Sequence, residues 1–277
     1  MKYRHSFHAG NFADVHKHVA LLAVIASLQR KDKGFLYLET HAGRGAYDLS
    51  ESPGSRASRA GLSRILAEPA AAEIEAYGKA VKHWRDLARD RNAYPGSPVL
   101  AAGALRDQDR AVLIELQPTE AHALERAVAH HANVRVEVGD GFEQLRAHLP
   151  PAQRRGLVLI DPPYEESSRD FERARAAITD TLQRFATAVI MLWYPIKDAR
   201  DTQQWRRRLV TSLKRPLLVS ELWVHPCDSR IALNGSGLVI IQPPYQQAQR
   251  MQTWVPQLVG MLDAAGTGGS LLEEVPG

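Results

Sequence analysis

The fold of this 277-residue chain is indicated most clearly by one stretch, Gly156-Leu157-Val158-Leu159-Ile160-Asp161-Pro162-Pro163-Tyr164. Its first five residues form a short apolar run bounded by glycine and proline, which is typical of a buried strand. An acid, two prolines and an aromatic residue therefore follow the carboxyl end of a strand. Since ligands bind at that end of the strands in open α/β sheets, the stretch predicts both an α/β fold and the edge that carries the site.

The residues after this strand suit methylation of an exocyclic amine on a flat ring. The amino nitrogen of adenine is a poor nucleophile, because its lone pair is delocalised into the ring. We expect Asp161 and the carbonyl of Pro162 each to accept one amino hydrogen, so that the lone pair points at an electrophile. The prolines stiffen the turn, and Tyr164 offers a ring on which a base can stack. The alternative is a rigid turn without chemistry, in which Tyr164 is a half-buried surface residue.

The rest of the chain alternates between apolar strands and amphipathic helices. We expect strands at 35–38, 111–116, 134–138, 157–160, 188–193, 217–224 and 237–241, and helices at 11–31, 119–131, 141–148, 169–185, 201–213 and 247–263. This alternation predicts a doubly wound, mainly parallel sheet. Because only about a dozen residues link the last two strands, we expect a hairpin there and hence an antiparallel edge strand.

Residues 50–98 interrupt the alternation. They contain helical patterns at about 56–67 and 73–91, separated and followed by proline- and glycine-containing turns. We therefore expect one domain over residues 1–277, with 50–98 as an inserted helical subdomain between the first and second strands. The glycine-rich stretch 264–270 is interpreted as a loose tail.

Three acids end three successive strands of the predicted edge: Glu115, Asp140 in the sequence Gly139-Asp140-Gly141, and Asp161. The loop Gly43-Arg44-Gly45 follows the first strand. Without the insertion, the order becomes strand, glycine loop, helix, strand and acid, as in a Rossmann-like cofactor site. Glu115 could then hold the ribose hydroxyls of an adenosine-containing cofactor, and Asp140 could accept from its adenine. Simpler interpretations are a surface acid for Glu115 and a helix N-cap for Asp140. The order of the acids predicts a class I S-adenosylmethionine-dependent methyltransferase.

Composition restricts the remaining classes. The net charge of +4 and the pI of about 9.2 permit a nucleic-acid partner. A single cysteine, Cys227, excludes an intramolecular disulfide and a cysteine-based zinc site. The longest apolar run, 19–28, is too short to span a bilayer, and the first residues lack the apolar core of a signal peptide. We therefore expect a cytoplasmic protein without membrane contact.

Histidine is concentrated at the start of the chain, with four of the eleven histidines in the first eighteen residues. No His-Glu-x-x-His pattern or suitably spaced acid completes a ligand set, so we expect no metal. His18 shares an apolar row with Leu22 and Ile25. That placement fits a core histidine as well as a residue that faces a cofactor.

Several motifs resemble the RlmJ family of bacterial methyltransferases, which act on N6 of an adenine in 23S ribosomal RNA. They lie at 3–18 (YRHSFHAGNFADVHKH), 35–43 (FLYLETHAG), 94–98 (YPGSP), 140–142 (DGF), 156–165 (GLVLIDPPYE) and 192–195 (LWYP). The resemblance extends over nearly the whole chain. It implies a class I methyltransferase fold with a helical insertion after the first strand.

The resemblance also implies roles for individual residues. The positions that match contacts to S-adenosylmethionine are His18, His41, Ser97, Glu115, Asp140, Gly141 and Asp161. Asp161 matches the catalytic acid, and Tyr3 matches a position that meets the substrate RNA. The partner implied is 23S rRNA, either protein-free or in an early assembly intermediate, and we expect the enzyme to be a monomer.

Two other functions remain open at this stage. Asp161-Pro162-Pro163-Tyr164 suits adenine in DNA as well as in RNA, although an insertion of about fifty residues is small for a DNA-recognition domain. A non-catalytic RNA-binding protein is the third possibility. The acids retained at every predicted strand end argue against it.

Overall fold

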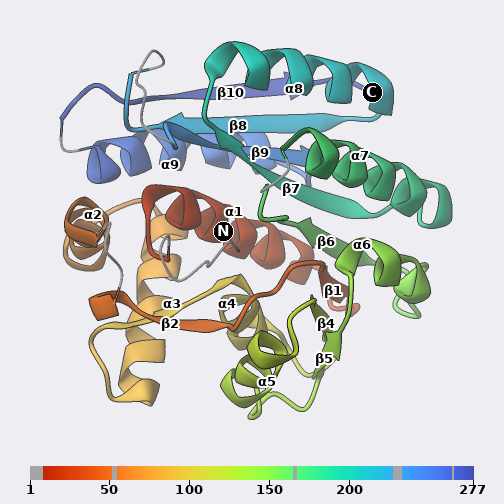
Figure 1. Cartoon of the computed structure of the whole chain (residues 1–277), viewed down its shortest axis with the longest axis horizontal. Helices are drawn as coiled ribbons and strands as arrows, with labels where there is room; N and C mark the ends of the chain where they lie inside the picture. The colour runs from red at the N-terminus through yellow and green to blue at the C-terminus, as the bar shows by residue number, and fades with distance from the viewer. Residues whose placement is uncertain (1–8, 52–54, 165–166, 227–232, 264) are drawn as a thin grey trace.

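A computed structural model describes residues 9–51, 55–164, 167–226, 233–263 and 265–277. The strands of its main sheet are β1 (Leu36–Glu39), β4 (Arg110–Glu115), β5 (Val134–Val138), β6 (Gly156–Ile160), β7 (Val189–Ile196), β8 (Leu217–Trp223), β9 (Gly235–Ile241) and β10 (Gly269–Val275). They are arranged in the order β10-β8-β9-β7-β6-β1-β4-β5 (Figure 1). All strands expected from the sequence are present, with boundaries shifted by a few residues.

The five strands β5, β4, β1, β6 and β7 are parallel, whereas β9 runs antiparallel to both of its neighbours, β7 and β8. The predicted hairpin of β8 and β9 is therefore confirmed. The predicted antiparallel edge strand is also present, but it is β10 and not a strand of the hairpin, because β9 lies inside the sheet.

The interpretation of 264–270 as a loose tail is also wrong from Gly269 onward, where β10 begins. A Cβ atom at Gly269 would lie 2.6 Å from Cζ2 of Trp223. Glycine is needed there because the backbone packs against the indole ring. Pairing with β10 also satisfies the backbone groups that β8 would otherwise expose.

Helices cover both faces of the sheet (Figure 1). One face packs against α1 (Phe12–Gln29), α4 (Ser97–Ala104), α5 (Pro118–Ala127) and α9 (Gln247–Leu262), and the other against α6 (Gly141–Gln144), α7 (Ser167–Arg184) and α8 (Ala199–Leu213). In β6, Leu157 and Leu159 face the first layer, while Val158 and Ile160 face the second. Burial on both sides explains why this strand is a continuous apolar run.

Helix α1 is buried over most of its length and carries polar side chains into the core. Asn11 caps it by accepting hydrogen bonds from the backbone of Ala13 and Asp14. The two ring nitrogens of His16 each lie 3.0 Å from a serine hydroxyl, of Ser236 and Ser220. Burial lowers the pKa of His16 to about 3, so this histidine is neutral and joins α1 to the sheet.

The chain between β1 and β4 contains a second, two-stranded sheet of β2 (Ala46–Asp48) and β3 (Ala93–Pro95), with α2 (Ser55–Ala67) and α3 (Ala72–Ala88) between its strands. The two helices were expected from the sequence, but the short strands were not. The antiparallel pair brings the two ends of this segment together, because Tyr47 lies opposite Tyr94. The delimitation of 50–98 as a subdomain stays a prediction.

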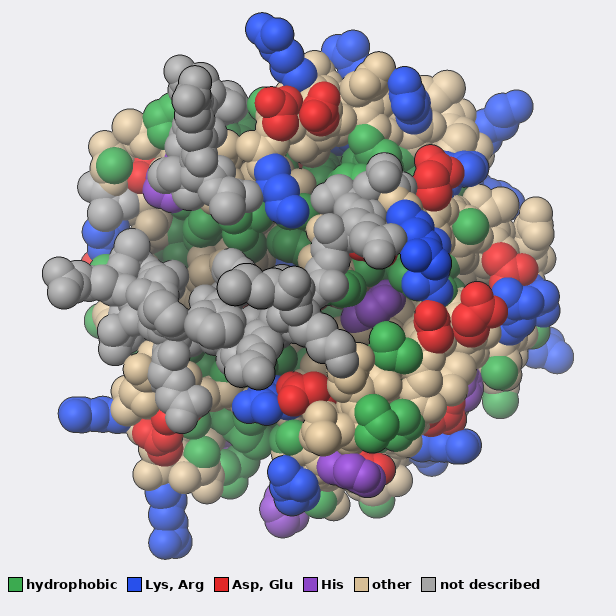
Figure 2. Space-filling view, viewed as in Figure 1, with side chains coloured by type: hydrophobic (Ala, Val, Ile, Leu, Met, Phe, Trp, Pro, Cys, Tyr) green, Lys and Arg blue, Asp and Glu red, His purple; other side chains and the backbone are tan. Residues whose placement is uncertain are grey.

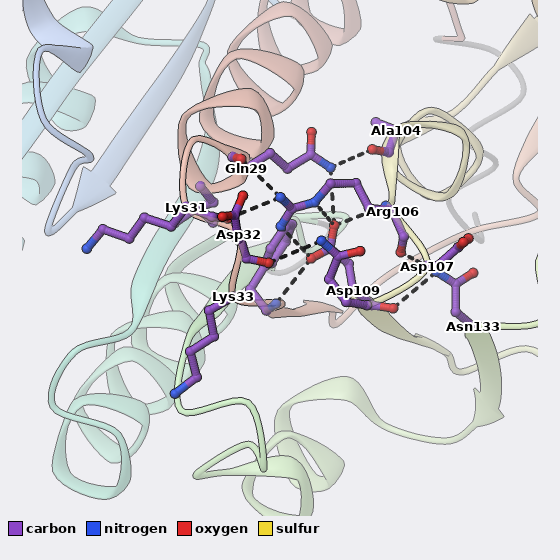
Figure 3. A network of polar contacts seen from close by, with 12 residues as sticks. Gln29, Lys31, Asp32, Lys33, Ala104, Arg106, Asp107, Asp109 and Asn133 are labelled. Carbon is purple, nitrogen blue, oxygen red and sulfur yellow. Dashed lines mark hydrogen bonds and ion pairs between the residues drawn. The ribbon is translucent and has the colours of Figure 1, made fainter.

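At the opposite end of the parallel strands, a polar network centred on Asp109 holds the start of β4 (Figure 3). The buried Asp109 carboxylate accepts hydrogen bonds from the backbone of Phe35 and from Arg106. Arg106 also donates to the carbonyl oxygens of Gln29 and Lys31. Burial raises the pKa of Asp109, but its hydrogen bonds outweigh that effect and the pKa is lowered. This network ties the turn after α1 to β4 and supports the register of β1 against β4.

Within the described residues, no helix is long and apolar enough to cross a membrane.

Candidate active site

The carboxyl ends of β6, β1, β4 and β5 lie side by side and carry most of the predicted site residues. Glu39, the last residue of β1, pairs with Leu159 of β6 and Leu113 of β4. Continuing that register by two residues brings His41 level with Asp161 on one side and with Glu115 on the other. The parallel sheet thus gathers residues that lie far apart in the sequence.

Asp161 forms a buried ion pair with Lys17 of α1. Lys17 Nζ lies 2.5 Å from Asp161 Oδ2 and 3.1 Å from Asp14 Oδ1, and it also lies 5.7 Å from the centre of the Trp193 ring. Burial lowers the pKa of Lys17, but the attraction of Asp161 and Asp14 outweighs it and holds the pKa well above its usual value. Lys17 is therefore a permanent cation between two carboxylates. Sequence reasoning missed it, because no local pattern connects it to an acid 144 positions away.

Tyr164 does not have the exposed ring that the sequence suggested. Only 1% of its surface is accessible. Its ring packs against Phe171 and Trp193, and its hydroxyl donates to the Trp193 carbonyl at 2.6 Å. Its φ of 52° lies in the left-handed region, which is costly for a non-glycine residue. In this conformation Tyr164 anchors the turn after Asp161 and offers no face for stacking. Pro162 is buried beside Asp161, and its role as a carbonyl acceptor stays a prediction.

Glu115 organises the glycine loop after β1. Its Oε2 accepts from the backbone nitrogen of Gly43 at 2.8 Å, and its Oε1 accepts from that of Gln117 at 2.8 Å. Gly43 and Gly45 have φ angles of +64° and +80°, which glycine adopts without strain. Each carboxylate oxygen retains a second lone pair, so each can accept one further hydrogen bond.

Asp140 is the N-cap of α6 and also pairs with an arginine, whereas its contact with a cofactor stays a prediction. Its Oδ1 accepts from the backbone nitrogen of Phe142 at 3.0 Å, which confirms the N-cap of α6. Its Oδ2 lies 2.7 Å from Arg173 Nη2. Burial raises the pKa of Asp140, but the bond and charge of Arg173 outweigh it, so the pKa is lowered. At Gly141 a Cβ atom would lie 1.8 Å from the Thr40 carbonyl oxygen, so only glycine fits there.

His41 lies between these groups. Its Nδ1 is 2.7 Å from Thr40 Oγ1, and its ring meets that of Phe142 edge-on at 4.7 Å. Burial lowers the pKa of His41 to about 4. The ring is therefore neutral at pH 7 and does not repel a cationic ligand.

Two other predicted residues, Ser97 and His18, lie behind this edge. Ser97 Oγ donates to Glu39 Oε1 at 2.5 Å, and the other Glu39 oxygen accepts from Tyr37. Burial raises the pKa of Glu39 to about 8, against the opposing effect of these bonds. The His18 ring is fully buried and lies 3.0 Å from the Tyr94 hydroxyl. This burial fits the core-histidine interpretation, and contact of His18 with a cofactor stays a prediction.

Two exposed apolar side chains also lie at the carboxyl edge of the sheet. Leu116 follows Glu115 and is 55% exposed, and Val138 ends β5 and is 46% exposed. Tyr3 lies outside the described residues. The part of the chain that the structure describes contains no group of three His, Cys, Asp or Glu side chains arranged to hold a metal ion.

The parallel strands with one reversed strand between β7 and β8, together with a glycine loop after β1, define the fold of class I S-adenosylmethionine-dependent methyltransferases. The chain belongs to the RlmJ family: the family model described as ribosomal RNA large subunit methyltransferase D, RlmJ, matches residues 32–275.

Individual relatives agree with this assignment. Ribosomal RNA large subunit methyltransferase J of Escherichia coli (strain K12) is 42% identical over 271 residues, which are 97% of this chain and 96% of the relative. The Haemophilus influenzae protein of the same name is 38% identical over 276 residues, 99% and 98% of the two chains. A crystal structure of a Legionella pneumophila protein superposes with a TM-score of 0.86 at 33% identity, covering 96% of this chain and 98% of that one.

Proposed function

We propose that this protein transfers a methyl group from S-adenosylmethionine to N6 of a specific adenine in 23S rRNA. The observation that carries the proposal is Asp161, held by Lys17 at the carboxyl end of β6. It stands at the same sheet edge as the glycine loop and the acids that suit a nucleoside cofactor.

The cofactor would lie over β1, β4 and β5. Glu115 would accept from the ribose hydroxyls, while Asp140 would accept from the adenine amino group, with Leu116 and Val138 as apolar surface beside the ring. S-adenosylmethionine supplies an electrophilic methyl group on a sulfonium sulfur. Because the His41 ring is neutral, it does not repel the positive charge of the sulfonium.

The target amine would be oriented by Asp161. Lys17 is bonded to Oδ2, so we assign Oδ1 to the amino hydrogen. Asp14, Lys17 and Asp161 together carry one net negative charge, which stabilises the positive charge that develops on nitrogen during attack. The methylated cation then loses its proton readily. Asp161 therefore acts by orientation and electrostatics, because the neutral amine is too weak an acid to be deprotonated before attack.

RNA as the substrate is supported by the names of the two relatives, both ribosomal RNA methyltransferases. The net charge of +4 agrees with an anionic partner. In Figure 2, Lys and Arg side chains are spread around the rim of the face in view. We propose that the substrate is 23S rRNA free of ribosomal proteins or in an early assembly intermediate, bound by a monomer.

The test is incubation with radiolabelled S-adenosylmethionine and either protein-free 23S rRNA or duplex DNA, followed by digestion to nucleosides. We expect labelled N6-methyladenosine from the RNA alone, and none with Asp161→Ala. Label in DNA would overturn the substrate, and label in another nucleoside would overturn the target atom.

A further inference from the structure

A pocket lies at the same edge of the sheet, beyond β7 and β8. Its volume is about 290 Å³, and its wall includes Ile196, Gln203, Arg206, Glu221, Trp223 and His225. Ile196 and Trp223 both pair with Gly235 of β9. The carboxyl ends of β7 and β8 are therefore level. The pocket lies at these ends, whereas the proposed cofactor lies at the ends of β1, β4 and β5.

Two chains of contacts connect this pocket to the turn after Asp161. Tyr164, Phe171, Trp205 and Tyr194 form a continuous aromatic series with ring centres 4.6, 4.2 and 5.0 Å apart. The Tyr194 hydroxyl then donates to Glu221 Oε1 at 2.7 Å, on the pocket wall. The pocket and the target turn therefore share one rigid support.

The second connection runs through α1. The pocket residue His225 meets the Phe12 ring edge-on at 6.4 Å, and Phe12 begins the helix that carries Lys17 to Asp161. Along β7, Ile196 lies four residues past Leu192, the partner of Ile160. At about 3.3 Å per residue, this places the pocket wall roughly 10 Å beyond the level of Asp161, a gap that a short single-stranded segment spans.

The charges of the inner wall favour a neutral ring over a phosphate. Arg206 Nη1 lies 3.0 Å from Glu221 Oε1, and Nη2 lies 3.7 Å from Glu273 Oε2. The one buried guanidinium is thus matched by two carboxylates, which would repel an anion. Trp223 and Ile196 supply apolar surface, and the acceptors and donors around them suit the edge of a base. The exposed Arg200 on α8 is the cation left for a phosphate.

We propose that this pocket receives the base of a second nucleotide of the substrate RNA, close to the target adenine and itself not methylated. The proposal rests on the function proposed above. It supplies what Asp161 alone lacks, because an amino-group acceptor cannot distinguish one adenine from another. The volume lies near the lower end of small-ligand pockets, which span roughly 300–1,000 Å³, and so fits a single nucleoside.

The test fills the pocket without touching the target site. Gln203→Trp places an indole in the pocket, and Gln204→Trp places one on the neighbouring exposed position of α8, which does not line it. The substrate is the shortest 23S rRNA fragment that the wild type methylates, intact or with one flanking nucleotide at a time made abasic. Both kcat/KM for the RNA and the Kd of S-adenosylmethionine are measured.

We expect one abasic position to lower kcat/KM of the wild type at least tenfold. Gln203→Trp should show a similar loss on intact RNA and no further loss at that abasic position, whereas Gln204→Trp should follow the wild type. The Kd of S-adenosylmethionine should not change in either variant. Equal abasic profiles for all three proteins, or a weaker Kd for Gln203→Trp, would overturn this inference alone. Failure of the wild type to methylate any RNA would overturn the proposed function and this inference with it.

Discussion

Replacement of Lys17 with methionine removes the cation that separates Asp14 from Asp161. The side chains of Lys17 and Asp14 are 4% and 5% exposed, and that of Asp161 is 10% exposed. Methionine preserves most of the volume of lysine, so the packing of α1 should survive. What remains is a pair of poorly solvated carboxylates without a counter-charge.

The cost follows from that burial. Breaking a buried ion pair by removal of one partner typically costs about 3–5 kcal/mol. We expect the lower end, about 3 kcal/mol, because Asp161 retains some contact with solvent. In a chain of this size that loss lowers the Tm by roughly 6 °C. The loss of activity should exceed what partial unfolding alone would cause, because Asp161 loses the group that holds Oδ2 in place.

The assay is a double-mutant cycle of Lys17→Met and Asp14→Asn, with the free energy of unfolding measured by urea denaturation. The double variant has one carboxylate fewer, so we expect it to regain at least about 1 kcal/mol over Lys17→Met. Lys79→Met is the control, because Lys79 is exposed and its Nζ lies as far as 4.0 Å from Glu75 Oε2. This substitution should change the free energy of unfolding by no more than about 0.5 kcal/mol.

The pH dependence gives a further check. The pKa of Lys17 is raised, so its contribution to stability is present below the pKa of an unfolded lysine and is lost only above the folded value. The wild type should therefore keep this contribution from pH 6 to 9. A Lys17→Met protein as stable and as active as the wild type would refute the reasoning.

Three other outcomes are expected. Asp161→Asn keeps an acceptor but loses the charge, and should lower the single-turnover methylation rate by at least about 100-fold; near-normal turnover would contradict the electrostatic role. Gly141→Ala puts a methyl group against the Thr40 carbonyl and should weaken S-adenosylmethionine binding at least tenfold by calorimetry, whereas Gly103→Ala, with open space at its Cβ, should not. Glu39 has a pKa of about 8 when folded, against 4.5 ordinarily. The native state then holds a proton that the unfolded chain has lost, so stability falls as pH rises between these values, by up to about 1.4 kcal/mol per unit. Glu39→Gln should flatten that slope in denaturation from pH 5 to 8, and an unchanged slope would show that Glu39 is not its source.

The sequence predicted the elements whose signals are local. A continuous apolar run identifies β6, and an acid directly after it is placed at the sheet edge by chain connectivity alone. The same holds for Glu115 at the end of β4 and for the N-cap of α6 by Asp140. Glu39 could have been noticed by the same reasoning, as an acid that ends an apolar strand. It was overlooked because a charged residue beside a glycine loop is ordinarily exposed.

The errors lie where a residue's environment depends on distant parts of the chain. Tyr164 looked like an exposed aromatic, but α7 and β7 bring Phe171 and Trp193 against its ring. The glycines of the C-terminal stretch suggested looseness, whereas Gly269 is glycine because Trp223 occupies the space of a side chain.

By itself, the sequence determined the fold class and the series of acids at the carboxyl edge, because hydrophobic period and connectivity set the order and direction of the strands. Only the tertiary structure decided which groups surround those acids. Lys17 meets Asp161 because α1 packs against β9 and β7, and Glu221 meets Arg206 because α8 packs over β8. Charge pairing in a buried site depends on distances of a few ångströms between residues far apart in sequence, which no local pattern encodes.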